Sequence, residues 1–232
     1  MTTATPVETT GPEAAVDGRS LEIVTTRRTD TREALLEAAI EVIEADGDSG
    51  FRISAVLDRV GVASTAIYHH FGSRDDLVDS ANAERYLRTL FIPGFDRVAD
   101  DIRACTSVEQ FDAIVDAIAS VGGDPGATPR RRARVAVLGS AVSRPSLAAK
   151  VGEANATYAR EMARVFRPAQ ERGWIRADLD LAAAAIWVIG QSTGRIMLEL
   201  GDPGFDVAHW SAIEHDAVVA MVTGRSGGPS PR

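Results

Sequence analysis

Along most of the chain, apolar residues recur every three or four positions, which is the spacing of one face of an α-helix. The first such stripe consists of Leu35, Leu36, Ala39, Ile40 and Ile43. It predicts a helix that begins at Asp30 or Thr31 and ends at Gly47. No segment alternates apolar and polar residues for long enough to predict a strand. The pattern therefore predicts an all-α protein with about nine or ten helices.

Short helices are predicted first along the chain, and longer ones after Pro93-Gly94. One short helix covers residues 53–60 and ends at Gly61, a second begins near Ser64, and a third is capped by Ser73 and runs to Leu90. The first of the longer helices is predicted to begin at Thr106 or Ser107 and to end at Ser120. The others are predicted over residues 129–142, 146–172, 180–200 and 206–222. On the helix over residues 129–142 we expect a group of arginines on the outer turn: Arg130, Arg131, Arg132 and Arg134.

Composition excludes several classes of protein. The chain has 232 residues, of which 45% are apolar and 25% charged, and this is typical of a globular protein with a buried core. The longest uncharged run, Leu181 to Gly194, is shorter than the ~20 residues of a membrane span. The N-terminus has no signal-like segment. We therefore expect no membrane partner and a location in the cytoplasm.

The sequence also contains no pattern that indicates catalysis or metal binding. The single cysteine, Cys105, excludes a disulfide scaffold and a multi-cysteine metal site. Nucleophile-elbow, phosphate-loop, dinucleotide-binding and zinc-protease motifs are all missing. His69 and His70 are adjacent, so they point to different faces of a helix and do not form a metal pair. We expect no enzyme activity, no cofactor and no metal site.

The segment from Gly61 to Leu77 carries the most information; it reads G-V-A-S-T-A-I-Y-H-H-F-G-S-R-D-D-L. A short helix, a glycine turn and a second short helix can form a helix-turn-helix, whose second helix lies in the major groove of DNA. Short side chains open this second helix and allow a close approach to base edges: Ser64, Thr65 and Ala66. Donors for phosphate groups follow them: Tyr68, His69, His70 and Arg74.

This segment resembles the N-terminal domain of the tetracycline-repressor (TetR) family of bacterial transcriptional regulators. The family pattern has a Gly-Val turn, a short recognition helix that ends in Tyr-x-His-Phe, and a basic residue that opens the next helix. Here these are Gly61-Val62, Tyr68, His70-Phe71 and Arg74. The resemblance covers roughly residues 31–90. It implies binding of double-stranded DNA, with a palindromic operator and a homodimer.

The sequence departs from the family pattern at two positions. Ala63 stands where the family usually has a capping Ser or Thr, so either Ser64 takes over or the cap is weak. A missing cap costs ~1 kcal/mol. Arg52 stands where the family usually has a Ser or Thr that contacts phosphate, and we expect it to make a longer-reaching contact. Arg27 and Arg28 form either a DNA-contacting arm or a solvated basic pair.

The resemblance further implies that the later helices form a ligand pocket. Candidate lining residues, each of which also fits a plain core, are Phe111, Asn155, Tyr158, Met162, Phe166, Trp187 and Gln191. Asn155 interrupts an apolar stripe, and it bonds either a ligand or a carbonyl in the core. Because we see no cluster of buried basic residues on these helices, we expect a small apolar or amphipathic effector.

The last two long helices are predicted to form the dimer interface. Gly190 and Gly194 are four residues apart, so they share a helix face and allow a partner helix to come close. Two copies of this helix pair would make a four-helix interface. The residues expected there are Ile186, Gly190, Gly194, Met197 and Val218.

The sequence thus predicts a TetR-like repressor that a small-molecule effector releases from its operator. The predicted parts are a flexible tail (residues 1–26), a DNA-binding domain (27–90), a ligand-binding and dimerisation domain (91–223) and a second flexible tail (224–232). The net charge of −8 leaves an alternative open, because residues 1–90 contain only nine arginines but sixteen acidic residues, and an acidic surface repels DNA. That alternative is a helical ligand-binding or interaction protein that has lost DNA binding.

Overall fold

A computed structural model of the chain describes residues 18–121, 124–202 and 204–224, and side chains from Asp30 onward. Within these ranges the chain is entirely helical, with eleven α-helices, one 3-10 turn and no strand, which confirms the predicted fold class. The elements are α1 (Gly18–Gly50), α2 (Ile53–Val60), α3 (Thr65–Phe71), α4 (Arg74–Leu90), α5 (Phe95–Ala104), α6 (Val108–Val121), η1 (Pro125–Ala127), α7 (Thr128–Val142), α8 (Pro145–Glu171), α9 (Leu181–Gly194), α10 (Ile196–Glu199) and α11 (Val207–Thr223).

The residues that end and cap the helices behave as the sequence predicts. Gly47 interrupts α1 with a positive φ of 73°, a conformation that glycine adopts without strain. The Ser73 side chain accepts a hydrogen bond from the backbone N–H of Asp76 at 3.0 Å. Asp180 caps α9 and Asp206 caps α11 in the same way. Such caps satisfy N–H groups that have no partner within the helix.

The start of the first helix was predicted incorrectly. α1 begins at Gly18, so residues 18–26, expected in a flexible tail, form helix instead. No Gly or Pro occurs between residues 19 and 46, and nothing in this stretch therefore stops a helix from extending beyond its apolar stripe. Residues 1–17 and 225–232, also predicted to be flexible, lie outside the described residues.

Contacts between helices divide the chain into two compact units, residues 1–70 and residues 71–232. In the first unit α1 packs against α2. Its buried residues include the predicted stripe positions Leu35, Ala39, Ile40 and Ile43, together with Val56 and Ile67. α4 packs against α7 and α8 and so belongs by contact to the second unit. The predicted functional boundary at residue 90 is a separate matter and stays a prediction.

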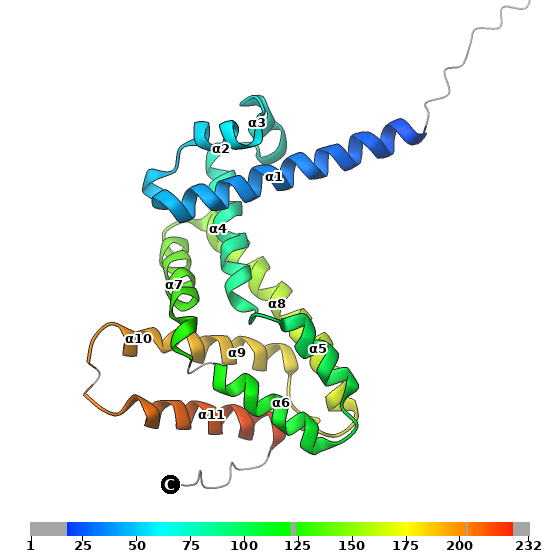
Figure 1. Cartoon of the computed structure of the whole chain (residues 1–232), viewed down its shortest axis with the longest axis vertical. Coiled ribbons are helices and arrows are strands. Elements are labelled where there is room, and N and C mark those ends of the chain that lie inside the picture. Colours follow the sequence, from blue (N-terminus) through cyan, green and yellow to red (C-terminus); the bar gives the residue numbers. More distant parts are fainter. Residues whose placement is uncertain (1–17, 122–123, 203, 225–232) are drawn as a thin grey trace, which may run out of the picture. The chain divides into compact units, whose positions relative to one another are not determined.

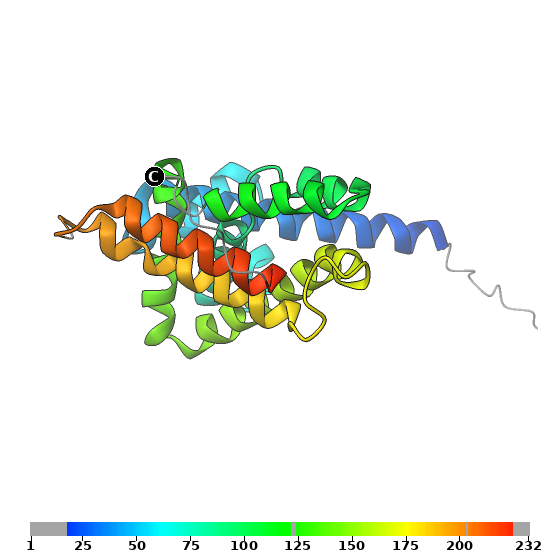
Figure 2. The same cartoon turned by 90° about the horizontal axis from the view of Figure 1, so that it is seen from below.

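In the second unit α8 is the central helix, and α4, α5, α7 and α9 all pack against it. α9 and α11 lie side by side and antiparallel, and α6 packs against α11 (Figures 1 and 2). The 10-residue helix α5 was not assigned from the sequence. It buries only Ala99 and Ile102, which is too short a stripe to stand out from its surroundings.

Two arginines of α7 lie inside the fold and not on an outer turn. Arg131 is 2% exposed and Arg134 is 4% exposed. Arg131 donates from Nε to Glu199 on α10 at 2.6 Å, and Arg134 donates to Thr89 on α4 and Thr193 on α9. A run of arginines on one helix suggests a solvated face. Here the partners that bury two of them, Glu199, Thr89 and Thr193, are distant in the sequence, so the sequence alone does not show the burial.

Candidate functional site

The helix-turn-helix in the first unit has the predicted geometry. α2 ends at Gly61, whose φ of 72° makes the turn and whose N–H bonds to the Leu57 carbonyl at 2.8 Å. Four residues later the chain enters α3 at Thr65, and Ala66 N–H donates to the Ala63 carbonyl at 3.0 Å. Residues with a Cβ rarely adopt the left-handed backbone conformation of Gly61. This explains why a glycine separates the two helices.

α3 buries one face and exposes the other. Ile67 is fully buried, while Tyr68, the next residue, is 62% exposed although it is a large aromatic. The other predicted contact residues that are exposed are Arg52, Ser64, Thr65, His69 and Arg74. Ala66 and His70 are half-buried. Most of the predicted DNA-contacting side chains are therefore accessible to solvent.

Acidic neighbours accompany the basic residues of this region. Arg74 lies 3.1 Å from Asp75, and Arg59 of α2 lies 3.5 Å from Glu41 of α1. These pairs are exposed, and exposed ion pairs contribute only about 0–1 kcal/mol, so a phosphate can compete for the arginine. Arg27 and Arg28 belong to α1, but their side chains lie outside the part of the chain that the structure describes.

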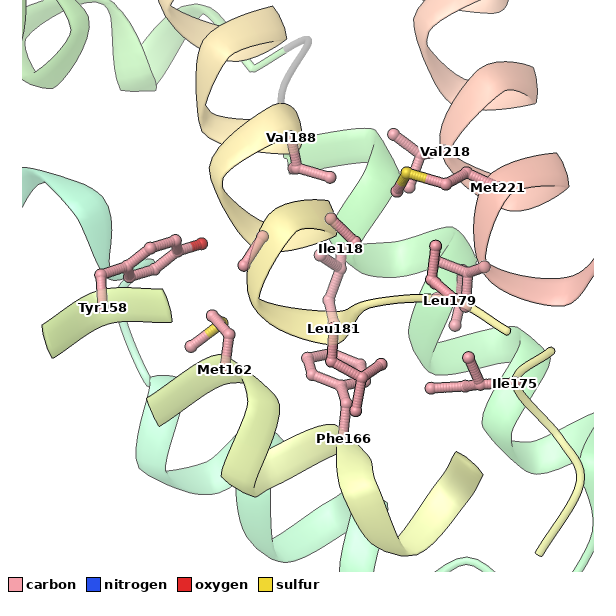
Figure 3. Close-up of a pocket in the computed structure, with 14 residues that line it drawn as sticks. Ile118, Tyr158, Met162, Phe166, Ile175, Leu179, Leu181, Val188, Val218 and Met221 are labelled. Atoms are coloured by element: carbon pink, nitrogen blue, oxygen red, sulfur yellow. The ribbon is translucent and has the colours of Figure 1, made fainter. Parts of the chain in front are cut away.

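The second unit contains an apolar cavity of about 90 Å³. Figure 3 shows its walls, which come from α6, α8, α9, α11 and the segment between α8 and α9. The hydroxyl of Tyr158 is the one polar side-chain group among its lining residues. Its lining residues are Val115, Ile118, Tyr158, Met162, Phe166, Ile175, Leu179, Leu181, Ala184, Ala185, Val188, Val218, Met221 and Val222.

Three of the predicted pocket residues line this cavity: Tyr158, Met162 and Phe166. Phe111 instead packs in the core against Phe166 and Trp174, with ring centroids 6.4 Å and 5.9 Å apart. Trp187 is an exposed residue of α9, and Gln191 is half-buried; neither is among the lining residues. The walls from α6, α11 and the loop before α9 were missed, because single aliphatic residues carry no signal of their own.

Asn155 follows neither of the two predicted alternatives. It accepts a hydrogen bond from the Tyr86 hydroxyl at 2.7 Å and so connects α8 to α4. Burial raises the pKa of Tyr86, so the phenol stays protonated and donates this bond at neutral pH. This hydrogen bond explains why a polar residue, Asn155, interrupts the apolar stripe of α8.

A second cavity, of about 80 Å³, adjoins the first and differs from it in polarity. The two share four lining residues: Ile118, Tyr158, Val188 and Val218. The second is also lined by Arg130, Arg131, Arg134 and Glu214. The prediction that no basic cluster is buried on the later helices is therefore wrong. The arginines escaped notice because they were assigned to an outer turn of α7.

The α9–α11 region presents an apolar surface to solvent. Exposed large apolar residues there are Ile186, Trp187, Met197, Leu200, Phe205 and Ile213. Gly190 is also exposed, and a Cβ added at Gly190 or Gly194 would meet no atom within 4 Å. Val218, predicted at the same interface, is 5% exposed and lines both cavities, so it lies inside the fold. The inner and outer faces of α11 are not distinguishable from the sequence, because they depend on which helix packs against α11.

The stretch Leu181–Glu199 also has the length and apolar composition of a membrane span, and most of it is not buried within the fold. Within it Arg195 is buried and lies 3.4 Å from Glu214 of α11. A charged residue paired inside the fold is typical of a helix that packs within a protein. The same exposed apolar surface is expected of a helix that meets a second protein chain.

The helix-turn-helix, with the exposed polar face of α3, is typical of a DNA-binding protein, and the helical unit that follows adds a cavity. Residues 35–81 match the family model described as bacterial regulatory proteins, tetR family. The matched segment is a DNA-binding domain of the TetR family of bacterial transcriptional regulators, a family of DNA-binding proteins and not of enzymes.

Similar proteins agree with this assignment. The chain is 25% identical to the HTH-type transcriptional regulator UidR of Escherichia coli (strain K12), over 73% of this chain and 77% of that protein. Its fold resembles a TetR-family regulator from Rhodococcus sp., with a TM-score of 0.56 and 19% identity over 84% of this chain and 99% of the other. It also resembles a regulator from Saccharomonospora viridis solved in complex with choline, with a TM-score of 0.52 and 20% identity over 85% of this chain and all of the other (100%).

Proposed function

We propose that this DNA-binding regulator acts as a homodimeric repressor in the cytoplasm and that a small molecule in the cavities of the second unit releases it from its operator. The observation that carries the proposal is that α4 connects the DNA-binding segment, which precedes it in the chain, with the helices that line the cavities. α4 follows the recognition helix α3 directly, and α4 is bonded to cavity-lining helices at Thr89 and Tyr86.

The first half of the proposal concerns DNA. We assign base edges to Ser64, Thr65 and Ala66, which open α3, and phosphates to Arg52, Tyr68, His69, His70 and Arg74. Six of these eight residues are exposed, while Ala66 and His70 are half-buried, and this accessibility supports a role in DNA contact. A helix-turn-helix meets base edges with the first residues of its second helix, whereas phosphate contacts carry no sequence information. The proposed DNA-binding domain extends over residues 27–90, so it includes α4.

The second half concerns the effector. Arg134 donates from Nη2 to the Thr89 carbonyl at 2.6 Å and from Nη1 to the Thr193 hydroxyl at 3.0 Å. A ligand that changes the bonding of Arg134 therefore changes what holds the end of α4. If the ligand binds better to an arrangement that is unsuitable for the operator, DNA and ligand weaken each other, typically by ~1–3 kcal/mol. The choline complex of a regulator with this fold gives a precedent for a small-molecule ligand.

The dimer is proposed to form through the exposed apolar surface of α9, α10 and α11. Large apolar side chains on this surface are too numerous for an ordinary monomer face. A partner helix can approach closely at Gly190 and Gly194, since neither glycine has a neighbour in the way. An interface of this kind also accounts for the apolar stretch Leu181–Glu199 without a membrane.

An electrophoretic mobility shift with the DNA upstream of the protein's own gene tests the proposal. We expect a retarded band with specific DNA that scrambled DNA of equal length does not compete away, and a protein-to-DNA ratio of two. Retardation that is equal on both DNAs would contradict sequence-specific regulation. Loss of the band with a small-molecule extract, and not with buffer alone, is the expected sign of an effector.

A further inference from the structure

The two adjoining cavities differ in polarity: the first is apolar, and the second contains a buried cation. Arg134 lies on α7, is 4% exposed and lines the second cavity. Among the residues that the structure describes, it has hydrogen bonds but no carboxylate partner. Its hydrogen-bond partners are the Thr89 hydroxyl at 3.3 Å, the Thr89 carbonyl at 2.6 Å and the Thr193 hydroxyl at 3.0 Å. A charge buried without a counter-ion is costly, and proteins rarely retain one without a use.

The donors of Arg134 are not exhausted by these bonds. A guanidinium has five N–H groups, one on Nε and two on each terminal nitrogen. The three bonds use Nε, Nη1 and Nη2 once each, so each terminal nitrogen keeps one further N–H. Two such donors on one guanidinium are suited to the two oxygens of a carboxylate.

The neighbouring charges leave this part of the cavity positive. Arg131 is paired with Glu199, and Arg195 is paired with Glu214. Arg130 donates to the Phe91 carbonyl at 3.2 Å and, like Arg134, has no carboxylate partner among the described residues. Two guanidinium charges therefore remain in excess around the second cavity. An anion entering here would be neutralised, whereas a cation would be repelled.

Tyr158 stands where the positive and the apolar cavities meet, because it lines both. Its hydroxyl has no hydrogen-bond partner within the described part of the chain, and Figure 3 shows it as the one oxygen among the drawn side chains. Burial raises the pKa of Tyr158 to about 12, with the Arg134 charge opposing this effect. The phenol is thus a neutral donor at physiological pH. It adds a third donor for an anionic group.

We propose that the paired cavities bind an apolar carboxylic acid, whose carboxylate lies on Arg134 and the Tyr158 hydroxyl and whose hydrocarbon body fills the cavity between α6, α8, α9 and α11. This proposal rests on the effector function proposed above and names the class of effector. The apolar walls supply most of the contact area, as is usual for small-molecule sites, while the two polar side chains orient the ligand.

Three probes with the same tail and different heads test the proposal on the full-length protein: decanoate, decan-1-ol and decylammonium. Binding is measured by isothermal titration calorimetry at neutral pH, below the micellar range of each probe. We expect decanoate to bind at least about tenfold more tightly than decanol, and decylammonium to bind most weakly. One charge-assisted hydrogen bond corresponds to about that factor. Equal affinities for decanoate and decanol, tighter binding of decylammonium, or no binding of decanoate would each overturn the proposal.

Substitutions locate the carboxylate. Arg134→Met is expected to weaken decanoate at least tenfold and leave decanol within about twofold, since methionine keeps an unbranched apolar stem and removes the charge. Tyr158→Phe should weaken decanoate alone by a few-fold. Arg132→Met is the matched control, because Arg132 is an exposed arginine on the same helix, and it should change neither affinity. An equal loss of both probes in Arg134→Met would overturn the assignment. If that variant fails to fold, Arg134→Lys and the comparison of probes on the wild-type protein still decide the question.

Operator release separates this proposal from the general effector function. The same probes are added to the protein bound to its operator. If decanoate binds through Arg134 and the operator stays bound, the carboxylate site holds and the effector function fails. If decanol releases the operator as well as decanoate does, the effector function holds and the carboxylate site fails.

Discussion

The two units of this protein build their sites in different ways. In the first, nearly every proposed contact lies within or just beside the seven-residue helix α3, on its exposed side. In the second, the cavity is assembled from four helices and a loop that span residues 115 to 222. The first site is local in the sequence, and the second depends on tertiary packing. Side chains of the first site should matter for binding alone, while those around the second should matter for folding and assembly as well.

The largest expected effect is on assembly, from Gly190→Arg. The added side chain meets no atom of its own chain within 4 Å, so it should disturb only a partner placed against α9. We expect the dimer dissociation constant to rise about a thousandfold, which is ~4 kcal/mol, and to leave a monomer at micromolar concentration in analytical ultracentrifugation. Gly152→Arg, at an equally open glycine on α8, is the control and should stay dimeric. A dimeric Gly190→Arg protein would move the interface elsewhere.

Breaking a buried ion pair in the second unit should reduce its stability. Glu199→Leu leaves Arg131 buried without its carboxylate. We expect the free energy of unfolding, measured by urea denaturation, to fall by about 3 kcal/mol. The double variant Arg131→Met/Glu199→Leu should recover most of this loss, because no unpaired charge remains. If the single variant is as stable as the wild-type protein, the second unit tolerates an unpaired buried charge, and the proposed dependence of its fold on these side chains is wrong.

In the first unit Thr65→Ala should change recognition without changing the fold, since Thr65 is exposed. We expect a loss of ~1–3 kcal/mol on the operator and little change on scrambled DNA, because base contacts carry the sequence information. Binding titrations on both DNAs and a thermal melt measure the two parts. Should Tyr68→Phe, and not Thr65→Ala, abolish the specificity ratio, the recognition helix enters the groove about one turn later than proposed.

The smallest expected effect is that of Arg74→Ala. Its exposed ion pair with Asp75 contributes little, so the substitution should leave stability unchanged. Binding to operator and scrambled DNA should weaken by similar factors, and the log–log salt dependence should flatten by about one unit, as expected for one lost phosphate contact. Arg164→Ala, an exposed arginine paired with Glu161 on α8, is the control and should leave the slope as it is. An unchanged slope in Arg74→Ala would remove this residue from the DNA contacts.

The predictions from sequence succeeded or failed according to how far the necessary information extended along the chain. Ser73, Asp180 and Asp206 were identified as caps because a cap depends on its own residue and the next three. Gly61 was identified as the turn between α2 and α3 for the same reason. The start of α1 was missed, since polar residues without a stop signal give no indication of where a helix begins.

The sequence alone determined the helical fold class, the helix-turn-helix and the glycine turn that leads into α3. It did so because helical period, caps and turns are encoded within a few residues of one another. Only the tertiary structure decided that Arg134 points inward beside an apolar cavity, that Val218 lines this cavity and not an interface, and that Asn155 bonds Tyr86. Which face of a helix is buried depends on the helices packed against it, and these come from segments 45 to 71 residues apart in the chain.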